Sequence, residues 1–179
     1  MGRAITLLAL LLACVVPRAE ADPRRVELGP PSSEVDIRAY RLGILPLDGK
    51  FDHFSGWLSY DPDNHRYCQV QLTIEANSLT IGESAMRAVV VGPEFLDVTR
   101  YPSLTYTGNC DGDRVKGALG MHGVTGSFPL SLTWSNDGVR AEGRLERAEW
   151  GMTALPLLAG RTILIRVVIS LTMSSTARN

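Results

Sequence analysis

Three histidines are the side chains best suited to acid–base or metal chemistry, and their placement argues against both. His53, His65 and His122 lie in separate segments, and none has a second histidine at the spacing of an HExxH zinc motif. The sequence also contains no GxSxG nucleophile elbow, P-loop or glycine-rich dinucleotide motif. We therefore expect no enzyme activity, no cofactor and no metal site, with each histidine in a turn or on the surface.

The acidic residues give no acid–base pair either. Three glutamates of the C-terminal half, Glu142, Glu146 and Glu149, share a region with Arg140, Arg144 and Arg147, which indicates solvated charges along a strand. The run from Asp61 to Asn64 resembles the start of a calcium loop, but it lacks the glycine and the final glutamate of an EF-hand. A polar turn is the better interpretation of that run.

Two cysteines can form a disulfide. Cys14 lies in an apolar N-terminal run that predicts export, which leaves Cys68 and Cys110 in the exported part of the chain. A bond between them would contribute roughly 4 kcal/mol on the chain-entropy estimate. The alternative is a pair of buried free thiols.

The N-terminus has the pattern of an export signal. Arg3 precedes an apolar run from Ala4 to Val16, and Ala19-Glu20-Ala21 is a small-x-small cleavage site before Asp22. We expect residues 1–21 to be a signal peptide and the protein to be periplasmic or secreted. Lipoprotein processing at Cys14 is the alternative. Residues 22–32 are polar and proline-bearing, and they are expected to form a leader or linker.

Composition indicates one ordinary globular domain. The 179 residues are 45% hydrophobic and 21% charged, with a formal net charge of -1. Because no stretch interleaves basic and aromatic residues, binding to nucleic acid is not expected.

The elements that could carry a site are strands. Alternation of apolar and polar residues is clearest from Cys68 to Ala76, and one dry face is typical of an antiparallel sheet. A hairpin is expected from Leu119 to Trp134, with its turn at Gly123–Gly126. Together with five further alternating runs this gives eight strands, which favour a closed antiparallel barrel. The break in alternation at residues 82–98 predicts one short helix, which either plugs the core or covers the mouth of a cavity.

Several ordered motifs resemble the YceI-like family. They are Gly49-Lys50-Phe51, Phe54-Ser55-Gly56, Tyr60-Asp61-Pro62, Phe95-Leu96-Asp97-Val98, Tyr101-Pro102, the run from Gly117 to Thr125, and the run from Arg147 to Met152. The resemblance covers about Ser33 to Met173 and places a YceI-like barrel domain at residues 33–175. It implies a lipocalin-like barrel in a secreted or periplasmic bacterial protein that holds polyisoprenoid or related long-chain lipids. Together with the strand pattern, this predicts an all-β fold, an eight-stranded antiparallel lipocalin-like barrel with one short helix inserted between strands. The segment Ala154–Gly160 departs from the family pattern because it is apolar.

The predicted function is non-catalytic binding, transport or sequestration of a polyisoprenoid or isoprenoid quinone inside the barrel. The predicted lipid-binding residues are the inward apolar rows Val35, Ile37, Leu58, Tyr60, Val70, Leu72, Ile74, Leu104, Tyr106, Leu119, Met121, Leu130, Leu132, Ile165 and Val167. The same residues could instead fill the barrel as an ordinary core.

The alternative function is an envelope-stress accessory or inhibitor module that binds a protein partner through exposed aromatics such as Trp57 or Trp134. Transient contact with a membrane or a partner protein stays open, as do a monomer and a homodimer.

Overall fold

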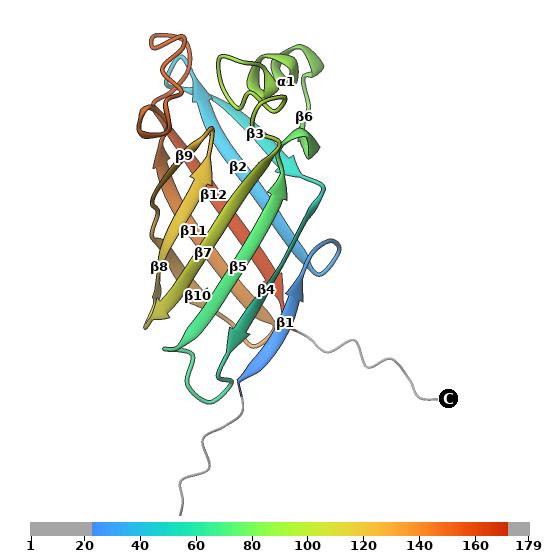
Figure 1. Cartoon of the computed structure of the whole chain (residues 1–179), viewed down its shortest axis with the longest axis vertical. Coiled ribbons are helices and arrows are strands. Elements are labelled where there is room, and N and C mark those ends of the chain that lie inside the picture. Colours follow the sequence, from blue (N-terminus) through green and yellow to red (C-terminus); the bar gives the residue numbers. More distant parts are fainter. Residues whose placement is uncertain (1–22, 172–179) are drawn as a thin grey trace, which may run out of the picture.

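The strands of the described part of the chain form a single antiparallel sheet that is curled into a barrel (Figure 1). The computed structural model describes residues 23–171. Its strands are β1 Arg24–Leu28, β2 Ser33–Arg41, β3 Leu45–Phe51, β4 Phe54–Tyr60, β5 Cys68–Glu75, β6 Leu79–Ile81, β7 Ser103–Asp111, β8 Arg114–Met121, β9 Val124–Ser127, β10 Leu130–Trp134, β11 Gly138–Glu146 and β12 Thr162–Ser170. The helices are α1 Ser84–Val91 and the short 3-10 helices η1 Ala76–Ser78 and η2 Arg147–Trp150.

The strand order confirms the all-β barrel but raises the strand count. Hydrogen-bonded neighbours follow the order β1-β4-β5-β7-β8-β10-β11-β12-β2-β3-β6, and β9 pairs with β8 outside this order. The sheet therefore has twelve strands where eight were expected. The four additional strands, β1, β3, β6 and β9, are short or interrupted by glycine and proline, so their alternation is weak. The path ends at β1 and β6, so in the described residues the hydrogen-bonded path does not run continuously around the barrel.

The segment 22–32 is a correction to the expected leader or linker. Its residues Arg24–Leu28 form β1, which pairs with β4 over the full strand. Val26 and Leu28 supply the apolar side of this strand, and Leu28 is buried in the core. Only Glu27 separates these two apolar residues, so the alternation is too short to stand out in the sequence.

The central hairpin also differs from the prediction. The turn lies at His122 and Gly123, which both have positive φ, one residue before the expected Gly123–Gly126. β9 then pairs back on β8 through Met121 and Val124. After Pro129, which has no N–H to donate to a ladder, β10 returns to β8 further down the strand.

The lower end of the barrel is closed by a disulfide and an aromatic cluster. Cys68 and Cys110 are bonded, with a Cα–Cα distance of 4.7 Å, which confirms the predicted pair. His65 stacks on Trp134 at 4.2 Å between ring centroids, and Tyr60 packs beside them at 5.5 Å from Trp134. Both ends of the described chain lie near this lower end (Figure 1).

The upper end carries helix α1 and the loop between η2 and β12 (Figure 1). Helix α1 confirms the helix expected within residues 82–98, and none of its residues is fully buried. It is therefore a cover over the end of the barrel. Within residues 23–171, no helix is long and apolar enough to cross a membrane. The predicted signal peptide and Cys14 lie outside the described residues.

Candidate functional site

The barrel interior contains a narrow apolar cavity of about 90 Å³. Eleven of the fifteen predicted lipid-binding residues line it: Val35, Ile37, Leu72, Ile74, Leu104, Tyr106, Leu119, Met121, Leu130, Ile165 and Val167. Because ligand pockets typically measure about 300–1,000 Å³, this cavity alone is too small for a long lipid.

Two large side chains explain why the interior is narrow. Tyr106 lies where a Cβ at Gly117 would stand, and a Cβ built on Gly143 would be 2.6 Å from Cζ of Phe128. The hydroxyl of Tyr106 donates to the backbone oxygen of Phe128 at 3.1 Å. Burial raises the pKa of Tyr106 far above its ordinary value. The inward glycines therefore accommodate aromatic rings and do not leave the interior empty.

The other four predicted residues do not line the cavity. Leu58 and Tyr60 are buried, whereas Val70 and Leu132 are half-buried against the same core. Tyr60 contacts the aromatic cluster of the lower end. These positions close the base of the barrel, and the structure does not bring them to the candidate site.

A wider apolar pocket of about 400 Å³, the mouth pocket, lies at the upper end. Its walls come from β2, β3, α1 and the loop before β12. They comprise Ile37, Ala39, Tyr40, Arg41, Leu42, Leu45, Leu47, Ile81, Met86, Val89, Val90, Phe95, Arg147, Leu155, Leu158, Ala159, Gly160 and Ile163. Ile37, Val90, Phe95 and Ile163 line both the mouth pocket and the interior cavity. The two spaces therefore meet at these side chains.

Most of the mouth pocket was missed because helix α1 and loops supply much of its wall, and because β3 and β6 were not predicted as strands. Of the predicted lipid-binding set, only Ile37 lines it. Two signals were present in the sequence: the uncharged run Ala154–Gly160, and the apolar spacing of Met86, Val89 and Val90 in the helix. Met86, Val89 and Val90 all line this pocket, so the helix covers the mouth of a cavity, which is one of the two roles expected for it.

Arg147 builds one wall of the mouth pocket. It was expected to be a solvated strand charge, which is wrong, because only 4% of the residue is exposed. Its Nε donates to the oxygen of Gly160 at 2.9 Å and its Nη2 to that of Ala159 at 3.2 Å, while Nη1 donates to Met152. Burial lowers the pKa of this guanidinium. A single side chain thus fixes both ends of the loop 152–160, and it replaces the water that these carbonyls would otherwise bind.

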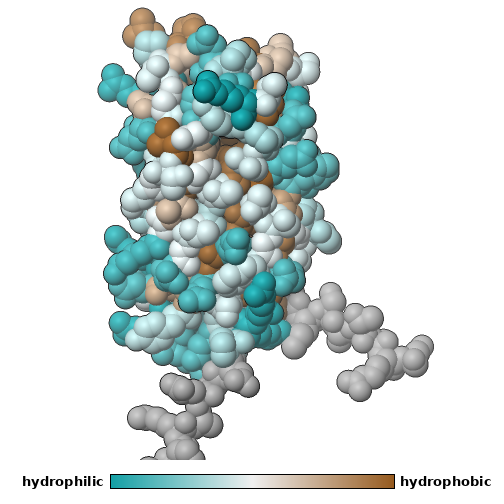
Figure 2. All heavy atoms as spheres, in the orientation of Figure 1, coloured by the Kyte–Doolittle hydropathy of each residue, from teal (hydrophilic) through white to brown (hydrophobic). Residues whose placement is uncertain are grey.

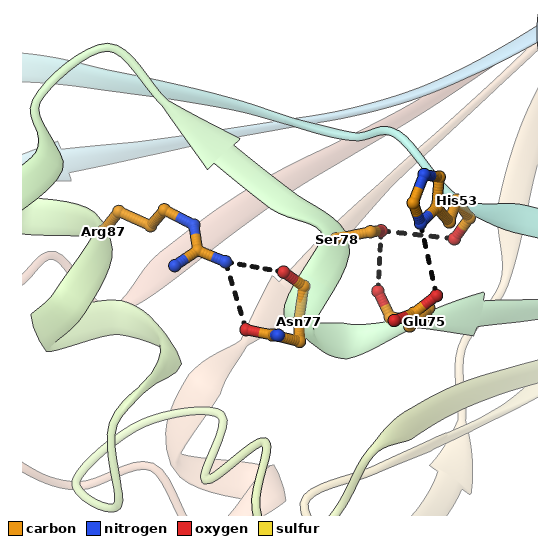
Figure 3. A network of polar contacts seen from close by, with 5 residues as sticks. All are labelled: His53, Glu75, Asn77, Ser78 and Arg87. Atoms are coloured by element: carbon orange, nitrogen blue, oxygen red, sulfur yellow. Dashed lines mark hydrogen bonds and ion pairs between the residues drawn. The ribbon is translucent and has the colours of Figure 1, made fainter.

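Helix α1 is fastened to the barrel by two arginines. Arg87 donates through Nε to the backbone oxygen of Leu79 at 2.6 Å. Its Nη2 donates to the backbone oxygen and to the side chain of Asn77 (Figure 3). In the same network, Ser78 donates to the oxygens of Glu75 and His53. Before the helix starts, Glu83 makes a double ion pair with Arg41 of β2. The cover is therefore attached along one side, by contacts to β2, η1 and β6.

The histidines have structural partners. His122 Nδ1 lies 3.0 Å from the oxygen of Trp150, and since a carbonyl only accepts, this nitrogen carries the proton. His53 lies 3.3 Å from Glu75. No group of three His, Cys, Asp or Glu side chains in residues 23–171 is placed to hold a metal ion.

The two tryptophans of the alternative function do not form a joint exposed patch. Trp57 donates to Gln71 and has Arg25 stacked over its ring at 4.4 Å. Trp134 stacks with His65 at the lower end.

A polar hollow of about 500 Å³ on the outer face of β2, β3 and β12 is a weaker candidate. Four of its five charged lining residues already lie in ion pairs: Arg38 with Asp48, Lys50 with Glu34, and Arg166 with Glu142. The hydrogen bond from Arg38 lowers the pKa of Asp48.

These features define a barrel with an apolar pocket at one end. Comparison of the chain with known protein families identifies the family. The YceI-like domain model matches residues 27–174, so the chain belongs to the YceI-like domain family. A UPF0312 protein of Pectobacterium atrosepticum is 28% identical over 134 residues, covering 66% of this chain and 70% of that protein. One from Vibrio cholerae is 25% identical over 161 residues, covering 85% of both.

Solved structures share the fold. BcnA of Burkholderia cenocepacia matches with a TM-score of 0.65 and 20% identity, covering 78% of this chain and 96% of that chain. A polyisoprenoid binding domain from Saccharophagus degradans matches with a TM-score of 0.55 and 17% identity, covering 77% and 92%.

Proposed function

We propose that this protein binds a long-chain apolar lipid of the polyisoprenoid or isoprenoid quinone class without chemically altering it. The observation that carries the proposal is the mouth pocket, which is apolar, within the size range of ligand sites, and adjacent to the interior cavity, with which it shares four lining residues. The family match and the likeness to a structure described as a polyisoprenoid binding domain support this class of ligand.

The ligand would lie mainly in the mouth pocket, with the end of its chain pointing into the narrow cavity. Each buried methylene contributes about 0.8 kcal/mol, so burial of roughly five would supply about 4 kcal/mol before the costs of ordering. Phe95, Val90 and Ile163 lie where the two spaces meet, and rotation of these side chains would set how far the chain enters.

The charges around the mouth pocket restrict the polar end of the ligand. Its charged lining residues are two arginines: Arg41 is already paired with Glu83, and Arg147 has no carboxylate partner among the described residues. A lipid with a neutral or anionic head group is therefore favoured over a cationic one.

We further propose that the protein works in the cell envelope after export, as a carrier or store of this lipid. The export signal predicted at residues 1–21 and the disulfide bond between Cys68 and Cys110 both fit an oxidising compartment.

Native mass spectrometry tests the proposal. The full chain, expressed with its N-terminal signal and purified from a bacterial envelope fraction without detergent, should carry one lipid per protein, and extraction should release an isoprenoid. A protein that stays empty after incubation with excess ubiquinone bearing its full isoprenoid tail would overturn it.

A further inference from the structure

Two loop tips at the mouth of the barrel expose large apolar side chains to solvent. Leu157 is 89% exposed and Ile44 is 76% exposed, the highest values among the large hydrophobic residues that the structure describes. Leu42, Leu155 and Leu158 are each about half exposed. Figure 2 shows apolar atoms at the upper end of the molecule, where Figure 1 places these loops.

The two loops form one platform. Leu42 donates its N–H to the oxygen of Leu158 at 2.9 Å, and Gly160 donates to the oxygen of Tyr40 at 2.7 Å. Arg41 and Ala159 form an antiparallel bridge between them. Arg147 holds the second loop by donating hydrogen bonds to the backbone oxygens of Ala159 and Gly160. The exposed leucines and isoleucine are therefore presented on a braced surface, which we call the mouth platform and define as residues 42–45 and 155–158.

The charge pattern of the platform matches a bilayer surface. Neither residues 42–47 nor residues 151–160 contain a charged side chain. The exposed Arg161 stands at the base of the second loop, and Arg41, which is paired with Glu83, stands at the base of the first. Apolar tips with arginines behind them suit lipid tails under a layer of phosphates.

We infer that the mouth platform docks on a lipid bilayer, with Ile44 and Leu157 inserted among the acyl chains. This inference extends the proposed function, because a mouth that sits in the bilayer lets an apolar lipid pass between membrane and barrel without crossing water. A bilayer fits better than a second copy of the chain, since the two most exposed large apolar side chains, Ile44 and Leu157, lie in two separate turns. The mouth platform also lies at the end of the barrel opposite the two ends of the described chain (Figure 1).

Flotation with vesicles of phosphatidylethanolamine and phosphatidylglycerol tests the inference on the mature chain from Asp22. The wild type should float with the vesicles, and the double variant Ile44→Asp/Leu157→Asp should bind at least about tenfold more weakly, because two apolar side chains no longer leave water. Tyr67→Asp is the matched control, because Tyr67 is 66% exposed in the loop at the lower end and should have no effect.

Several results would overturn the inference: a wild type that does not float, a double variant that floats as well as the wild type, or an equal loss in Tyr67→Asp. A wild-type dimer that the double variant abolishes, without flotation, would assign the platform to a second copy. Circular dichroism on each variant shows that it is folded.

Loading with ubiquinone in solution separates this inference from the proposed function. The double variant should still load, because neither Ile44 nor Leu157 lines the mouth pocket. A wild type that loads but does not float contradicts the docking surface alone, and one that floats but never loads contradicts the proposed ligand alone.

Discussion

The guanidinium of Arg147 lies over the ring of Phe95, 5.5 Å from its centroid, at the point where the mouth pocket meets the interior. Through its other contacts this arginine holds the loop 152–160. It therefore couples the wall of the pocket to the passage beneath it.

Replacing Arg147 by methionine should destabilise the fold by roughly 2–4 kcal/mol, because three loop carbonyls lose a charged donor. Urea unfolding measures the change, and Arg144→Met, at an exposed position three residues earlier, is the control. A loss no greater than in the control would show that the loop does not depend on Arg147.

Removal of the disulfide should cost about 4 kcal/mol, since the bond closes a loop with a sequence separation of 42. The double variant Cys68→Ala/Cys110→Ala should therefore unfold at clearly lower urea. Because the bond lies at the lower end of the barrel, the variant should still load lipid under native conditions. If its stability equals that of the wild type, the bond contributes nothing to folding.

Tyr106 should make the protein sensitive to alkali. Its folded pKa is raised above the ordinary value of 10.0 by burial, so the contribution to stability is complete below pH 10.0 and is lost as pH rises above it. Phenylalanine at this position cannot ionise, so Tyr106→Phe should lose less stability than the wild type between neutral pH and strong alkali. The variant should also be about 1 kcal/mol less stable at neutral pH, because the hydrogen bond to Phe128 is lost. Parallel pH curves for the two proteins would contradict this account.

The mature N-terminus should be Asp22. Intact mass measurement of the exported protein distinguishes this end from an acylated Cys14, which would add the mass of lipid chains to a longer polypeptide. Detection of the acylated form would place the protein on a membrane by a covalent anchor and would refute cleavage after Ala21.

The sequence predicted the sheet better than the site. Residues that alternate strictly, such as Leu72 and Ile74, were placed correctly on the inner face because a strand with one dry side has a period of two. Strand β3 escaped prediction because Pro46 and Gly49 interrupt that period. Neither effect changed the fold class.

The mouth pocket could not be derived from strand periodicity, because loops and a helix supply much of its wall. Arg147 is buried because it donates to backbone carbonyls 5 to 13 residues further along the chain. Its charge alone predicted an exposed side chain. How wide the interior is depends on where the rings of Tyr106 and Phe128 lie, which alternation does not specify.

Filling the mouth pocket is the most direct test of the central claim. Ala39→Trp places a large ring in this pocket, and Ala118→Trp places the same ring on the outer face of the barrel. Binding of ubiquinone should be at least about tenfold weaker for Ala39→Trp, because roughly two methylenes or more lose their place in the pocket. It should be unchanged for Ala118→Trp. Equal binding by Ala39→Trp and the wild type, with both proteins folded, would contradict the claim that the lipid lies in the mouth pocket.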